Sequence, residues 1–113
     1  MTITPKTLVA GQYLHTSASS HYLAPSLTKG VFTNATITNT HSSNAVTATV
    51  HVIDTGASET NLNMVIAART ISPLECYKCP ELAGKGVAAT GTLRALASST
   101  STLAFNVYGY EVT

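Results

Sequence analysis

Charged residues are scarce in this sequence. Six Lys and Arg and five Asp and Glu make up 10% of the 113 residues, whereas ordinary soluble domains carry about 25% charged residues. The six basic residues are scattered, and binding nucleic acid or an acidic membrane needs clustered Lys and Arg. We therefore expect neither nucleic acid nor a membrane as a partner. Because charge keeps isolated proteins apart, its scarcity predicts that much of the surface meets other subunits.

Long apolar runs are also missing. No stretch approaches the roughly 18 residues that a membrane-spanning helix needs. The residues that follow Lys6 do not form the apolar core of a secretory signal. We therefore expect a soluble protein made in a cytosol, where thiols stay reduced.

Cysteine occurs only twice, in Cys76-Tyr-Lys-Cys79. This spacing suits half of a zinc site, but the site would need a second ligand pair, and no second Cys pair exists. A thioredoxin-like pair begins a helix, which the pattern around these residues does not predict. In a strand, residues three apart point to opposite faces, which disfavours a bridge. We interpret Cys76 and Cys79 as structural thiols.

The histidines and carboxylates show no catalytic or metal-binding pattern. No two histidines lie two or four residues apart, and the five carboxylates are isolated. The sequence also lacks a Gly-x-Ser-x-Gly elbow, a phosphate-binding glycine loop and a His-Glu-x-x-His motif. We therefore predict no enzyme, catalytic residue, cofactor or metal site. The histidines are interpreted as surface or inter-subunit groups that make assembly respond to pH near 6 to 7: His15, His21, His41 and His51.

What the sequence has in abundance is threonine, serine, alanine and valine in period-2 alternation. Runs of about ten residues alternate between two faces and are separated by turn formers, which is typical of half-buried strands. The run 31–40 is the first clear case. Its residues on one predicted face are Val31, Thr33, Ala35 and Ile37, and those on the other are Phe32, Asn34, Thr36 and Thr38.

A second alternating run, 45–53, follows four polar residues at positions 41–44. A connection of four residues between two alternating runs predicts that they pair as a β-hairpin. The residues on one predicted face of this run are Val46, Ala48, Val50 and Val52, and those on the other are Thr47, Thr49 and His51.

Further strands are predicted along the rest of the chain. A helix competes over 62–71, because its apolar residues also have helical spacing, but the β-rich context favours a strand. About eight short strands predict an all-β fold, an antiparallel two-sheet β-sandwich that is either jelly-roll-like or immunoglobulin-like. We expect one domain over 1–113, with 1–18 an alternative N-terminal arm. The further strands are 8–15, 21–23, 62–71, 76–79, 87–89, 92–97 and 103–112.

Tyrosines and the chain ends supply the candidate interaction residues. Tyr108 and Tyr110 lie two apart on one predicted face, as expected for an interface or a sugar-binding platform, and the absence of tryptophan disfavours the sugar. Exposed edge strands invite pairing, so segments 2–9 and 108–113 are predicted to pair between subunits. The candidate interface residues are Leu8, Val9, Tyr13, Tyr108, Tyr110 and Val112.

Several short strings occur in a recognisable order. A Thr-rich strand pair is followed by Ile-Ser-Pro-Leu-Glu75, Cys79-Pro-Glu-Leu82 and a closing Leu93 to Thr113. Over residues 19–113 this order resembles small virion structural proteins of tailed bacteriophages. The resemblance implies a β-sandwich that acts as a symmetric oligomer, with no catalytic residue to carry over.

The resemblance and the composition together predict a capsid decoration or cement protein. Its partners would be other copies of itself and the major capsid protein. It would be made in the cytoplasm of the host bacterium and located in the virion. A neck, collar or tail protein is the alternative, and a glycan-binding module is a further one.

Overall fold

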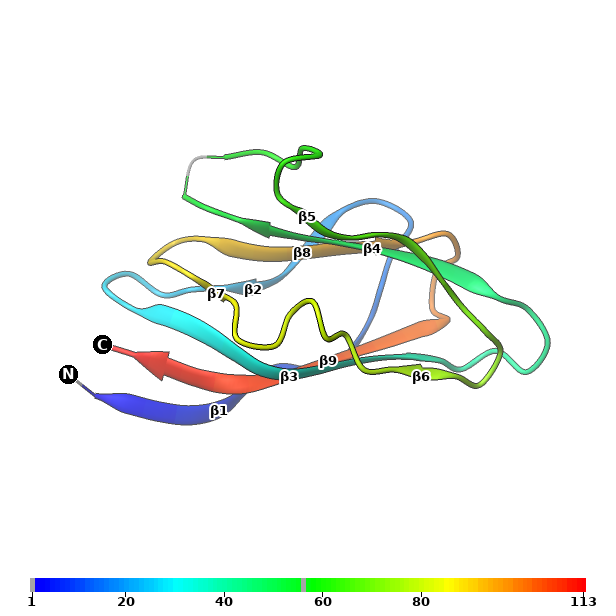
Figure 1. Ribbon diagram of the computed structural model, residues 1–113, viewed down its shortest axis with the longest axis horizontal. Helices are drawn as coiled ribbons and strands as arrows, with labels where there is room; N and C mark the ends of the chain where they lie inside the picture. The colour runs from blue at the N-terminus through cyan, green and yellow to red at the C-terminus, as the bar shows by residue number, and fades with distance from the viewer. Residues whose placement is uncertain (1, 56) are drawn as a thin grey trace.

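The computed structural model describes residues 2–55 and 57–113. In these residues the regular structure consists of nine strands in two antiparallel sheets (Figure 1). The predicted all-β, antiparallel two-sheet sandwich is confirmed. The described residues include no helix that could span a membrane. The strands are β1 (Ile3–Tyr13), β2 (Ser19–Leu23), β3 (Lys29–Asn39), β4 (Val46–Ile53), β5 (Met64–Ile71), β6 (Cys76–Tyr77), β7 (Gly86–Val87), β8 (Thr92–Ala97) and β9 (Leu103–Val112).

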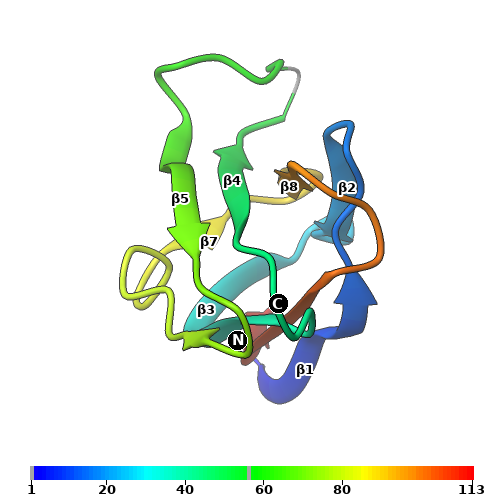
Figure 2. The ribbon, with the colours of Figure 1, turned by 90° about the vertical axis from the view of Figure 1, so that its right-hand side faces the viewer.

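The strand order is that of a jelly roll. The first sheet has the order β1-β9-β3-β6, with β7 also paired to β3, and the second has the order β2-β8-β4-β5. β1 thus pairs with β9, β2 with β8, β3 with β6 and β7, and β4 with β5. This is one long antiparallel hairpin folded over on itself, with its turn between β4 and β5. Figure 2 shows the two layers end-on, with the β4–β5 connection arching over the second sheet.

The predicted hairpin between 31–40 and 45–53 is wrong. Both strands exist, but β3 lies between β9 and β6 in the first sheet, and β4 lies between β8 and β5 in the second. The connection crosses from one sheet to the other, and buried Asn39 holds this crossing. Its Nδ2 donates to the carbonyl oxygens of Asn44 at 2.9 Å and Ile71 at 3.0 Å, and its Oδ1 accepts from the His41 N–H at 2.9 Å.

The predicted faces hold in β4 and β9 and fail in the first half of β3. The pairing of β3 with β9 is irregular between Phe32 and Asn34, where β3 has one extra residue. An extra residue of this kind reverses the alternation, so the side chains on one side of the bulge point to the face opposite to the predicted one. Phe32 therefore joins Ala35 and Ile37 in the core, and Val31 turns outward opposite Tyr110.

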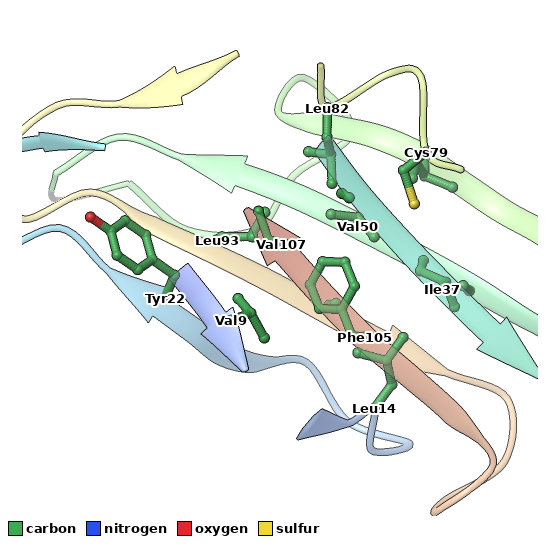
Figure 3. Close-up of a cluster of buried hydrophobic side chains, with 14 of the residues drawn as sticks. Val9, Leu14, Tyr22, Ile37, Val50, Cys79, Leu82, Leu93, Phe105 and Val107 are labelled. Carbon is green, nitrogen blue, oxygen red and sulfur yellow. The ribbon is translucent and has the colours of Figure 1, made fainter. Parts of the chain in front are cut away.

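The core lies between the sheets and takes side chains from both (Figure 3). Phe105 and Val107 of β9 meet Val50 of β4 and Leu93 of β8, and all four are fully buried. Burying an aliphatic or Phe side chain contributes about 1.5–3 kcal/mol. These side chains join the two sheets through one hydrophobic core.

The two cysteines occupy different surroundings beside β3. Cys76 is exposed and Cys79 is buried, and both are free thiols. Burial raises the pKa of the Cys79 thiol to about 12, so it stays protonated at neutral pH. Cys79 therefore packs as a small apolar side chain.

Candidate subunit interface

The outer face of the first sheet is the surface on which most of the predicted interface residues meet. We define it as alternate residues of β9 from Ala104 to Val112, together with the residues opposite them on β1 and β3. Residues directly opposite in an antiparallel pair point to the same face. Tyr110 lies between Pro5 and Val31, and Val112 lies in the neighbouring row.

The outer face has almost no charge. Among its residues only Lys29, in the row of Ile3 and Val112, is charged. The other charged groups of these strands, Lys6 and Glu111, belong to the opposite face and lie 3.3 Å apart. Across the sandwich, the hydroxyl of Tyr22 donates to Glu111 at 2.6 Å. This hydrogen bond is the main reason that the pKa of Glu111 is held below its ordinary value.

The structure divides the predicted interface residues into two groups. Tyr13, Tyr108, Tyr110 and Val112 share the outer face, where Tyr13 is 48% and Tyr108 43% exposed. The prediction differs for Leu8 and Val9, which are buried within the chain and belong to its core. Both fall at an irregularity of β1, which turns neighbouring residues inward. Pro5 and Val31 are outer-face residues that the alternation did not reveal.

Segments 2–9 and 108–113 were expected to pair between subunits. That expectation is wrong for the second segment, because β9 already pairs on one edge with β1 and on the other with β3. An extended arm was the alternative expectation for residues 1–18. Of these residues, 3–13 form β1, an edge strand of the first sheet. Pro5 offers no N–H, and two register shifts interrupt β1, which are features that protect an edge from pairing.

The β4–β5 connection covers part of the outside of the second sheet. His51 lies on the predicted face of β4, opposite Arg94, yet it is buried. The β4–β5 connection covers it: Asn63 Oδ1 lies 2.9 Å from His51 Nδ1, and Glu59 forms an ion pair with Arg94. The Arg94 hydrogen bond holds the pKa of Glu59 below its ordinary value. This part of the second sheet therefore carries an ion pair and a covering loop, whereas the outer face of the first sheet has Lys29 as its one charged residue.

Two histidines whose sequence spacing did not predict a contact lie side by side at the β1–β2 connection. The rings of His15 and His21 stack with centroids 6.5 Å apart, and Phe105 meets the His21 ring edge-on at 5.7 Å. His21 Nδ1 lies 2.8 Å from Gln12 Oε1, while its buried Nε2 has no hydrogen-bond partner. Burial, and then the charge of His15, lower the pKa of His21. The described residues contain no group of three potential metal ligands and enclose no pocket.

We expect this cluster to make the fold acid-sensitive. Since the folded-state pKa of His21 is lowered, the unfolded chain binds a proton more readily below about pH 6.5. The free energy of unfolding should therefore fall as the pH drops from about 6.5 toward the lowered folded-state pKa of His21, as measured by urea midpoints from pH 7.5 to 5. His21→Gln should flatten this dependence, with His41→Gln as the control. An equal slope in His21→Gln and the parent would contradict the assignment.

No family model, curated protein or solved structure matches this chain. The likeness to bacteriophage virion proteins therefore stays a prediction from the sequence.

Proposed function

We propose that this chain is a structural subunit of a bacteriophage virion, and that it serves as a capsid decoration protein. It would be made in the host cytoplasm and would pack its outer face against neighbouring subunits in the shell, with other copies of itself and the major capsid protein as partners. The observation that carries this proposal is the outer face itself, a bare sheet surface with three tyrosines and a single charged residue, Lys29. Interface cores are depleted in charge and enriched in Tyr.

The size of the molecule suits this role. Its extents are 47 × 27 × 20 Å, and its accessible surface is 5760 Å². A stable interface needs about 800 Å² from each partner, which is about one seventh of that surface. A broad sheet face can supply it without any rearrangement of the fold. Each added interface must break before the shell opens, so stabilisation would accumulate with every copy bound.

The fold agrees with the proposed role, but it does not by itself argue for that role. Jelly rolls occur in viral capsid proteins and in lectins, and a fold alone does not define a function. The rival role in the neck or tail would use the same uncharged face in fewer copies. Quantitative mass spectrometry of purified particles separates the two. A ratio to the major capsid protein near one, or a simple fraction of it, supports decoration, a few copies indicate the neck or tail, and absence overturns the proposal.

A charge placed on the outer face should block assembly. Tyr108 is exposed, so Tyr108→Lys should fold normally, yet a desolvated ammonium in the interface should lower incorporation into particles at least tenfold. Thr70→Lys, at an exposed position of β5 in the second sheet, is the matched control and should incorporate like the parent. Binding of Tyr108→Lys at the parental level would place the interface elsewhere. Unchanged assembly together with lost sugar binding would favour the glycan-binding module.

A further inference from the structure

Two tight turns hold leucine in a backbone conformation that leucine disfavours. In the turn 25–28 the Thr28 N–H donates to the Pro25 carbonyl at 3.2 Å, and in the turn 72–75 the Glu75 N–H donates to the Ser72 carbonyl at 3.0 Å. The third residue of each is leucine in the left-handed region, with φ 59° at Leu27 and 60° at Leu74. Glycine or asparagine is the usual choice at such a position.

Neither leucine is compensated by packing within the chain. Leu27 is 90% exposed and Leu74 is 68% exposed. By contrast, Thr90, which also has a positive φ, lies with its hydroxyl 2.6 Å from that of Thr55. Strained positions that the fold does not need are found where a protein contacts a ligand or partner. The same combination of a turn, an exposed leucine and left-handed backbone occurs twice, which points to a shared role.

The two turns lie at opposite ends of β3. Leu27 comes just before the strand begins at Lys29. Leu74 lies beside the other end, where the Asn39 N–H donates to the Glu75 carbonyl at 2.9 Å. Eleven residues of strand separate them by about 35 Å. Figure 1 shows the two connections at opposite ends of the long axis.

We propose that Leu27 and Leu74 are anchors that insert into apolar pockets on two neighbouring copies of one shell protein, so that each molecule bridges the junction between them. This inference rests on the proposed function and specifies its partner. Neither leucine belongs to the outer face as defined above, on which a second copy of this chain would pack. Two like anchors at a fixed separation match a repeating surface, and the rigid turns present them without an ordering cost.

The test replaces each leucine with asparagine, which tolerates the left-handed backbone. Leu27→Asn and Leu74→Asn should each raise the melting temperature by about 4 °C, because strain is relieved. Each should also weaken binding to particles produced without this protein by about 100-fold, since a two-point contact becomes a one-point contact. Co-sedimentation of the purified chain with those particles measures the affinity. Leu62→Asn is the matched control, because Leu62 is 98% exposed and lacks a positive φ, and it should bind like the parent.

The outcomes separate the two proposals. If the parent chain does not bind these particles, the proposed function fails, and this inference fails with it. If the parent binds and either leucine variant binds equally well, only the bridging inference is overturned. A leucine variant that changes the oligomeric state of the free chain in light scattering would assign the anchors to a second copy and overturn the inference as well.

Discussion

Replacing Gly109 with alanine should lower the free energy of unfolding by ~4 kcal/mol or more. A Cβ at this position would collide with the carbonyl oxygen of Val31 and would lie 3.0 Å from its carbonyl carbon. These are backbone atoms of β3, which is held by β9 on one side and β7 on the other. The strand therefore cannot yield as a flexible side chain would. Domains of this size have a free energy of unfolding of about 5–15 kcal/mol, and separating two central strands should remove ~4 kcal/mol or more.

The control for this substitution is Gly84→Ala. A Cβ on Gly84 meets nothing within 4 Å, so the only penalty is its φ of +84°, about 1–2 kcal/mol. Circular dichroism and urea unfolding should show both variants destabilised, with the urea midpoint of Gly109→Ala lowered at least twice as far as that of Gly84→Ala. A Gly109→Ala midpoint close to that of the parent would show that β3 and β9 separate more easily than their contact implies.

Gly109 illustrates what the sequence could and could not predict about the fold. Local alternation located most of the strands, including β5, where a helix had competed, but it missed residues 3–7 of β1. It could not predict their partners, because pairing in a jelly roll joins residues far apart, such as Ile3 with Val112. β3 and β4, which follow one another in the chain, lie in different sheets. The need for glycine at position 109 arises only from the long-range approach of β3.

Bulges limited the prediction of faces for a similar reason. One extra residue in β3 moved Phe32 into the core and Val31 to the outside. Threonine at position 33 is as suitable for a regular strand as for a bulge, so no local signal marks the shift. The irregularities of β1 likewise placed Leu8 and Val9 in the core, although both had been expected at an interface.

The candidate interface was predictable where it depended on one strand. Tyr108, Tyr110 and Val112 are two residues apart, and β9 is regular, so period-2 spacing placed them on one face. That Tyr13 joins them depends on its pairing with Ala104, which only the folded register reveals. The His15–His21 stack also depends on tertiary structure, because His15 lies in the β1–β2 connection and His21 in β2.

Asn39→Asp should be the most informative change in the crossing between sheets. Asn39 is fully buried, and its Nδ2 donates hydrogen bonds to the carbonyl oxygens of Asn44 and Ile71. The isosteric carboxylate would place an oxygen against both carbonyls and would bury an unpaired charge. Breaking a buried polar pair in this way costs about 3–5 kcal/mol. We expect the urea midpoint at pH 7 to fall accordingly, whereas Asn34→Asp, an exposed control, should change stability by about 0.5 kcal/mol or less.

The pH dependence of Asn39→Asp supplies an independent check of its cause. Burial among carbonyl oxygens should raise the folded-state pKa of the new carboxyl above its unfolded value of about 3.9. The unfolded state then binds fewer protons, so the penalty grows as the pH rises and shrinks as it falls toward 4. The quantity to follow is the difference in midpoint from the parent at each pH, because His21 destabilises both proteins in acid. A difference that does not change between pH 7 and 4 would mean that lost hydrogen bonds alone, and no buried charge, weaken the crossing between the sheets.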